Sequence, residues 1–341
     1  MTHKLTLTIL IALCVIIAGC KGKKTQIEQT EEQTEIEEQI KEEVQPEQTE
    51  ESASPLVSYQ TQRPLSSLSA LRGRAGIGVN VSEIDPVYFQ NPDLDVLRQM
   101  GADQFLISYF SGEQFYRDGN YDRAITEYTS SINRNGEFIE ALVSRGNSWL
   151  KKRDYSRAID DYTRAIRLDG SRAELYNYRG YARAERGEMN QAVEDFTRAI
   201  ALNKNYVDAL INRSHALYQI GDYDKVIEDC DRIINLEPSN AVIWNRRGTA
   251  WYRKEDDDKA IKDFTEAIRL RSDYAVAWYN RGNAWYSKGE LDRALSDLNR
   301  TLAINPSFAA AYTSRGNILR LQGNTESANS DFASAQRLQG R

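Results

Sequence analysis

The sequence predicts an all-α protein, a solenoid of seven 34-residue helix-turn-helix repeats preceded by a disordered tether. Two observations lead to this fold class. From Phe105 onward, small, small and large residues return at fixed offsets with a period of 34 residues and no insertion, which is typical of a helical repeat array. Before residue 55, the chain is rich in Glu, Gln, Thr and Lys and poor in apolar residues, which is typical of disorder.

Residues 1–19 have the features of a lipoprotein signal peptide. One lysine precedes an apolar run, residues 5–18, which is too short to cross a bilayer comfortably as a mature helix. The run ends in Ile17-Ala18-Gly19-Cys20, which resembles a lipobox, and the resemblance implies lipidation of Cys20 and a stable lipid anchor. Because Lys21 is not aspartate, resemblance to sorted lipoproteins implies the outer membrane, facing the periplasm, rather than the inner membrane. An ordinary signal peptide or an uncleaved anchor is the alternative.

Two segments separate the anchor from the repeats. Residues 20–54 form an acidic tether, in which eleven glutamates and four lysines between residues 21 and 51 give a net charge of -7. As a flexible coil this tether would average about 30–35 Å from end to end. Residues 55–104 are a connector, and Asn91-Pro92-Asp93 predicts the start of a short capping helix.

Three residue series define the repeats, which we number from their first residue. Position eight is small, position twenty is small and position twenty-four is usually large, so that two antiparallel helices can approach closely where they cross. The repeats span 105–138, 139–172, 173–206, 207–240, 241–274, 275–308 and 309–341. Position eight holds Gly112, Gly146, Gly180, Ser214, Gly248, Gly282 and Gly316, and position twenty-four holds Tyr128, Tyr162, Phe196, Cys230, Phe264, Leu298 and Phe332.

Helix ends follow the same period. Five glycines predict a left-handed residue after the first helix, and Arg153 and Glu255 replace glycine in the other two repeats with this turn, so a different turn is expected there. The residues expected to cap the second helices are Asp122, Ser156, Asn190, Asp224, Asp258 and Asp292. In the last repeat Asn329 and Gln336 replace apolar residues, which predicts the polar outer face of a terminal repeat.

This pattern is similar to the tetratricopeptide repeat over residues 105–341. The resemblance implies a right-handed superhelix whose first helices line a concave groove that binds a peptide or protein, with contacts from positions two, five, nine, twelve and thirteen. The resulting candidate binding residues are Tyr109, Tyr116, Asn147, Asn177, Tyr181, His215, Tyr218, Asn245, Tyr252, Tyr279, Asn283, Tyr286 and Asn317. Tyrosines and amides suit an extended peptide, although about half of these tyrosines are expected simply to pack between helices.

Other constellations favour structural roles. Arginines at position seven recur with aspartates at position twenty-three, which indicates ion pairs between packed helices rather than a row that reads an anionic ligand. His215 is the only histidine left after removal of the predicted signal peptide, so no second histidine can join it in a site. Cys230 is expected to be a buried small residue, and Asp256-Asp257-Asp258 lacks the spaced ligands of a calcium site. No catalytic residue, metal site or cofactor is predicted, and no basic footprint for nucleic acid is present.

The sequence therefore predicts a non-enzymatic, membrane-anchored scaffold of the cell envelope that binds a protein partner. Two alternatives remain open. The chain could be an accessory subunit of a solute-uptake system that binds a small ligand or a soluble binding protein, or an assembly factor for outer-membrane proteins or regulator of wall enzymes. An open groove favours the scaffold and the assembly factor, whereas a deep closed pocket favours the uptake subunit. The sequence does not define the oligomeric state.

Overall fold

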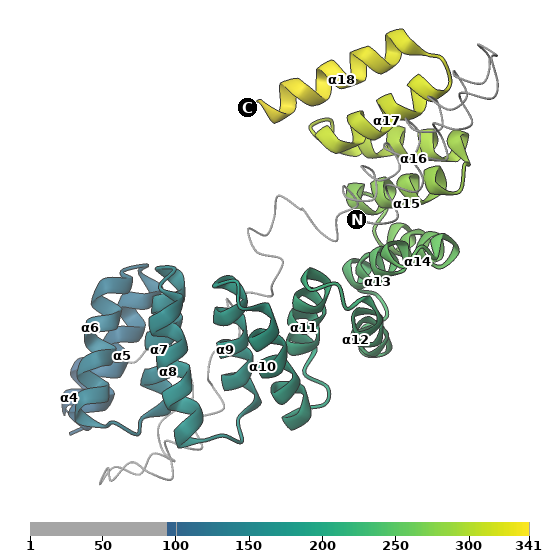
Figure 1. The fold of residues 1–341 in the computed structure, drawn as a ribbon. Helices are drawn as coiled ribbons and strands as arrows, with labels where there is room; N and C mark the ends of the chain where they lie inside the picture. Colours follow the sequence, from purple (N-terminus) through teal and green to yellow (C-terminus); the bar gives the residue numbers. More distant parts are fainter. Residues whose placement is uncertain (1–93, 100, 341) are drawn as a thin grey trace, which may run out of the picture. The chain divides into compact units, whose positions relative to one another are not determined.

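The computed structural model describes residues 94–99 and 101–340, so the predicted signal peptide, Cys20 and the tether lie outside the described residues. Within that part of the chain there are fifteen helices and no strand, which confirms the all-α solenoid fold class (Figure 1). The helices divide into two compact units, residues 94–238 and residues 239–340, called here the N-terminal and C-terminal units. No helix among the described residues is both long and apolar enough to span a membrane.

The N-terminal unit consists of successive helix pairs that follow α4, and consecutive helices within the unit pack against each other. The helices alternate between a first and a second helix of a repeat, as the 34-residue period predicts. The unit comprises α4 (Leu94–Gln99), α5 (Gln104–Arg117), α6 (Tyr121–Arg134), α7 (Ile139–Lys151), α8 (Tyr155–Leu168), α9 (Ala173–Glu185), α10 (Met189–Leu202), α11 (Val207–Gln219) and α12 (Tyr223–Leu236).

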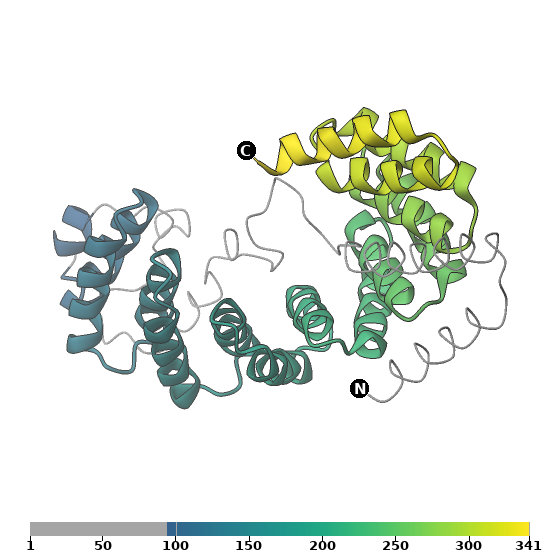
Figure 2. The ribbon, with the colours of Figure 1, turned by 45° about the horizontal axis from the view of Figure 1, so that its top comes forward.

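The C-terminal unit repeats the same arrangement, and its three pairs lie side by side in Figure 2. The second helices bury a small residue at position twenty, an aspartate at position twenty-three and, in α14 and α16, a large apolar residue at position twenty-four. The unit comprises α13 (Ala241–Arg253), α14 (Asp257–Leu270), α15 (Ala275–Ser287), α16 (Leu291–Ile304), α17 (Ala309–Leu321) and α18 (Thr325–Gln339).

Glycine at position eight sets how closely the two helices of a repeat approach. A Cβ placed on Gly180 would lie 2.7 Å from the Phe196 ring, and one on Gly112 would lie 2.6 Å from the Tyr128 ring. These separations are far below van der Waals contact, so any side chain at these glycines would displace the aromatic ring. The small-and-large pattern in the sequence is therefore the packing rule of the repeat.

The turn between the helices of a repeat uses a left-handed residue even where glycine is missing. Gly119 has φ 73° and Gly221 has φ 81°, while Arg153 has φ 58° and Glu255 has φ 64°. The expectation that the last two turns differ is wrong. The N–H of Asp154 donates to the Trp149 carbonyl just as the N–H of the residue after each glycine donates five residues back, so the closure of the helix imposes the conformation.

The caps of four second helices are also shifted from the prediction. Asn120, Asp154, Asp222 and Asp256 stand directly before α6, α8, α12 and α14, and each side chain accepts a hydrogen bond from the N–H three residues ahead. The predicted caps lie two residues later, inside the first turn, because the residue directly after the left-handed one is the cap and the helix begins at the next residue. Two of these predicted caps, Asp122 and Asp258, instead pair with Lys152 and Lys288 of the following repeat.

The ends of the array differ from its interior. In α4, which occupies the segment where a capping helix was expected, Leu97 is buried in the core of the first repeats. At the other end, Asn329 and Gln336 of α18 are exposed, whereas the equivalent isoleucines of earlier repeats are buried or, for Ile166, partly buried. The polar outer face predicted for the terminal repeat is confirmed.

Candidate peptide-binding groove

The first-helix face is the set of side chains at positions two, five, nine, twelve and thirteen of the first helices. Most of the candidate binding residues on it are buried. In the N-terminal unit Tyr109, Asn177, His215 and Tyr218 are buried and Tyr116, Asn147 and Tyr181 are partly exposed. In the C-terminal unit Asn245, Tyr252, Tyr279, Asn283, Tyr286 and Asn317 are all buried. Their role in binding a partner stays a prediction.

Two of the predicted asparagines hydrogen bond to the neighbouring first helix. The Nδ2 of Asn212 donates to the Oδ1 of Asn177 at 3.2 Å, and the Nδ2 of Asn280 donates to the Oδ1 of Asn245 at 3.1 Å. All four side chains are fully buried, so these amide pairs join repeat three to four and repeat five to six. Asn212 and Asn280 are not among the residues predicted from the sequence. Their separation of 35 residues from their partners, one more than the period, is the signal that could have found them.

The buried tyrosines of this face pack against other aromatic rings. Tyr109 lies 5.1 Å from Phe138 and 5.9 Å from Tyr128 between ring centroids, and Tyr279 lies 4.9 Å from Phe308. Ser314 of the next repeat also reaches the Tyr279 hydroxyl, at 3.5 Å. Such ring pairs add to the stability gained by burial of the rings within a repeat, and the Ser314 contact links Tyr279 to the next repeat as well.

Partly exposed polar groups gather on α5, α7 and α9. Asn147 accepts a hydrogen bond from the Tyr162 hydroxyl at 2.7 Å through its Oδ1. At the same position of repeat one, Glu113 accepts hydrogen bonds from the hydroxyls of Tyr128 and Ser144, both at 2.8 Å. Burial, together with nearby Tyr121 and Glu113, raises the pKa of Tyr116 to about 12. Its hydroxyl is therefore protonated at neutral pH and can both donate and accept.

The outer face carries the predicted arginine–aspartate ladder. In repeat four, Nε and Nη2 of Arg213 donate to the two oxygens of Asp229 at 2.9 and 2.6 Å. Nη1 of the same arginine donates to Thr197 of the preceding repeat at 3.0 Å. The bidentate pairing recurs in every repeat from two to seven: Arg145–Asp161, Arg179–Asp195, Arg213–Asp229, Arg247–Asp263, Arg281–Asp297 and Arg315–Asp331. The structural interpretation of the row is confirmed.

Burial opposes ionisation within the ladder. It raises the pKa of the Asp229 carboxyl, and the hydrogen bonds and charge of Arg213 offset part of that rise. Because Asp229 is enclosed and Arg213 also donates to Thr197 of the preceding repeat, the Arg213 guanidinium joins three helices. The guanidinium is thus committed to protein partners rather than presented to a ligand.

The remaining candidates show no chemistry of their own. His215 is buried at 6% exposure, and Cys230 is fully buried as predicted. Asp256 caps α14 and Asp258 pairs with Lys288, which accounts for two carboxylates of the acidic run. Among residues 94–99 and 101–340, no group of three or more His, Cys, Asp and Glu side chains is placed to hold a metal ion.

Paired helices with small residues at each crossing, joined by a polar ladder, define a helical-repeat protein. Tetratricopeptide repeat profiles match residues 111–173, 143–206 and 179–241 as well as 275–308, and a profile described as a TPR repeat matches 248–289. These matches cover more than half of the chain, which is a member of the tetratricopeptide repeat family.

Solved structures agree with this fold. A tetratricopeptide repeat protein from Parabacteroides merdae is 18% identical, with a TM-score of 0.57, over 69% of this chain and 93% of that one. The C-terminal part of a TPR repeat-containing protein from Cytophaga hutchinsonii is 12% identical, with a TM-score of 0.57, over 67% and 93%. A MamA protein is 27% identical, with a TM-score of 0.48, over 50% and 94%. No curated protein sequence matches the chain.

Family membership bears on function at a coarse level. Tetratricopeptide repeat proteins are generally non-catalytic scaffolds, and the architecture described here fits a protein-interaction scaffold. The fold by itself names no partner.

Proposed function

We propose that the chain is a scaffold protein of the cell envelope, held by a lipid on Cys20, that binds a peptide segment of a partner protein along its first-helix face. The location that we propose is the outer membrane, facing the periplasm. The observation that carries the proposal is the run of tyrosines and amides on successive first helices. Rings with polar tips offer apolar contact area together with hydrogen bonds, a combination enriched where proteins bind one another.

The partly exposed groups on α5, α7 and α9 are the most accessible part of this face. Asn147 uses its Oδ1 for the Tyr162 hydroxyl, which leaves the amide nitrogen as a donor for a carbonyl of the peptide. Tyr116 keeps its proton at neutral pH and can serve either polar group of a peptide backbone. These helices belong to three successive repeats, so an extended peptide can contact all of them at once.

The groove is tested with a partner recovered by affinity capture from detergent-solubilised membranes and identified by mass spectrometry. Replacement of Tyr116 or Tyr181 by alanine should weaken the affinity for this partner about tenfold or more, as expected for central aromatic contacts. Lys262→Ala, which changes an exposed residue of α14, is the control and should leave the affinity intact. Titration calorimetry measures the affinity of each variant for the partner. A loss of affinity in Lys262→Ala, with none in the tyrosine variants, would refute binding along the first-helix face.

The buried tyrosines are tested with a substitution that keeps the aromatic ring. Tyr252 and Tyr286 are only 2% and 4% exposed, so alanine would leave a cavity and lower stability whatever their role in binding. Phenylalanine keeps the ring and removes the hydroxyl. If these hydroxyls contact the partner, Tyr252→Phe and Tyr286→Phe should weaken binding while the melting temperature changes little; unchanged affinity would restrict both residues to packing.

The anchor is tested separately. Cys20→Ser should abolish labelling by a radioactive or clickable fatty acid and should release the protein from membranes or block its processing. Cys14→Ser is the matched control, because it removes the other amino-terminal thiol but leaves the lipobox, and labelling should persist. A Cys20→Ser protein that is still processed and membrane-bound would rule out lipidation at this cysteine.

A further inference from the structure

A second recurring arrangement lies at position eleven of the first helices. Repeats two, five and six have tryptophan there, and a cation eight residues later covers the indole. The three pairs, with the distance from the cation to the ring centroid, are Arg157 over Trp149 at 4.6 Å, Lys259 over Trp251 at 4.0 Å and Arg293 over Trp285 at 4.7 Å. Trp285 also packs against the cluster formed by Ile261 and Phe264 of the preceding repeat. The indole thus fills the space between its own repeat and the preceding one, and the cation lies over the indole ring.

Repeats three and four close this space by other means. Arg183 has replaced the tryptophan in repeat three and donates to Asp195 at 2.8 Å. Leu217 stands there in repeat four and is only 1% exposed. Both repeats lie inside the array and bury or pair the residue at position eleven.

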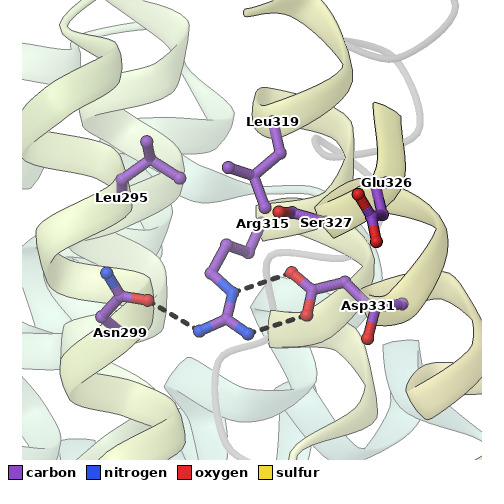
Figure 3. Close-up of a pocket in the computed structure, with 8 residues that line it drawn as sticks. Leu295, Asn299, Arg315, Leu319, Glu326, Ser327 and Asp331 are labelled. Atoms are coloured by element: carbon purple, nitrogen blue, oxygen red, sulfur yellow. Dashed lines mark hydrogen bonds and ion pairs between the residues drawn. The ribbon is translucent and has the colours of Figure 1, made fainter. Parts of the chain in front are cut away.

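The last repeat leaves the same space open. Leu319 replaces the tryptophan and Ser327 replaces the cation, and a cleft of 470 Å³ lies between α16, α17 and α18 (Figure 3). Its apolar part comes from Leu295 and Leu319, both partly exposed. The Arg315–Asp331 pair, to which Asn299 adds an acceptor for Nη1 at 2.7 Å, forms a polar wall.

The cleft carries a net negative charge, which comes from one carboxylate. Arg315 and Asp331 neutralise each other, with Nε and Nη2 of the arginine 2.8 and 2.7 Å from the two carboxylate oxygens. Glu326 lines the cleft, is exposed, and makes no ion pair with the described residues. In repeats two, five and six, the residue that follows the counterpart of Glu326 is a lysine or an arginine. Repeat seven has Ser327 there, so its cleft lacks one positive charge as well as one indole.

We propose that this cleft is a docking site for an aromatic side chain, an indole in particular, that a partner protein presents beside a lysine or arginine. The ring would pack on Leu295 and Leu319 as Trp285 packs on the preceding repeat, and the neighbouring cation would face Glu326. The chain itself supplies the template for this occupant three times. The cleft shares no residue with the first-helix face, so this docking site does not depend on the groove.

The probes are blocked dipeptide amides added to the full chain, with titration followed by methyl NMR of leucine side chains. N-acetyl-Trp-Lys-amide should shift the Leu295 and Leu319 signals and bind about tenfold or more tightly than N-acetyl-Leu-Lys-amide, as expected for an aromatic anchor in a pocket. N-acetyl-Trp-Glu-amide should bind more weakly than the lysine probe because its carboxylate would face Glu326. Equal binding of the tryptophan and leucine probes, or shifts confined to other leucines, would overturn the proposal.

Two variants make the test specific to the cleft. Leu319→Trp combined with Ser327→Arg rebuilds the arrangement of repeat six, which should fill the cleft and abolish binding of the Trp-Lys probe. Ala333→Arg adds the same charge to an exposed position of α18 and should leave binding unchanged. Glu326→Lys alters an exposed side chain only, and should reverse the preference between the lysine and glutamate probes.

The groove variant Tyr181→Ala separates the two proposals. It should leave binding of the Trp-Lys probe unchanged even where it weakens binding of the captured partner. Persistent binding of the probe by the rebuilt Leu319→Trp, Ser327→Arg protein would sink the docking site and leave the groove untouched.

Discussion

Repeats three and four, which are neighbours in the N-terminal unit, solve the same packing problem differently. In repeat three the helices cross at Gly180 and Phe196, where a Cβ on the glycine would lie 2.7 Å from the ring. In repeat four the same positions hold Ser214 and Cys230, and both side chains are fully buried. A glycine with a large ring and a serine with a small thiol fill comparable space. The crossing therefore constrains the pair of residues and not either residue alone.

The largest expected effect comes from breaking one member of the pair. Phe196→Cys gives repeat three the cysteine of repeat four but not its serine, so a cavity is left beside Gly180. This variant should lower the free energy of unfolding by about 3 kcal/mol. Gly180→Ser alone should also destabilise the fold, by about 1–3 kcal/mol, because the new side chain collides with the ring. Urea titrations followed by circular dichroism measure both changes.

The double variant sharpens the comparison. Gly180→Ser with Phe196→Cys recreates the pair of repeat four, so its cost should fall short of the sum of the single costs by about 1 kcal/mol or more. Strictly additive costs would contradict the idea that the two positions share one volume.

The outer ladder distinguishes the same two repeats. Asp195 of repeat three pairs with Arg179 and also with Arg183, whereas Asp229 of repeat four is held by Arg213. Arg213→Ala should therefore cost roughly 1–3 kcal/mol, and Arg179→Ala less, because Asp195 keeps a second arginine. Equal costs for the two substitutions would show that the second arginine contributes nothing.

The pH dependence of this difference follows from the pKa of Asp229. Burial raises that pKa and Arg213 opposes the rise, so without Arg213 the folded-state pKa should move further above that of the unfolded chain. A raised carboxyl pKa means that the folded state takes up the proton first, so protonation stabilises it as the pH falls. The penalty of Arg213→Ala should shrink from pH 7 toward acid, which a series of urea titrations would reveal.

These particulars show what the sequence can and cannot predict. The period predicted the helix pairs, the crossing glycines and the arginine pairs, since each follows from a contact inside one repeat. The sequence could not predict that Asn177 and Asn245 face the neighbouring first helix, because that depends on how the repeats stack. It also placed the second-helix caps two residues late, since the residue that closes the first helix fixes where the second begins.

The docking cleft illustrates the same limit. The change from tryptophan to Leu319 is visible in the sequence, but its consequence is not, because Leu217 is buried at the equivalent position of repeat four. Only the packing of α16, α17 and α18 reveals that the space stays open. A substitution within a repeat is thus interpretable once its neighbours across the repeat boundary are known.

The smallest expected effect concerns the turns between the two helices of a repeat. Repeats three and four both have glycine at the left-handed position, whereas repeats two and five have a residue with a side chain there. Gly187 and Gly221 take the left-handed conformation without a Cβ penalty, whereas Glu255 adopts φ 64° with a full side chain. That conformation costs an L-residue about 1–2 kcal/mol, and glycine gives back roughly 0.5–1 kcal/mol through its greater freedom in the unfolded chain. Glu255→Gly should therefore raise the free energy of unfolding by about 0.5–1 kcal/mol, and Gly221→Ala should lower it by about the same amount. Thermal melts of the two variants provide the measurement. Should Glu255→Gly prove destabilising, the glutamate side chain must contribute more to the turn than its backbone conformation costs, and the equivalence of the seven turns would hold in geometry but not in energy.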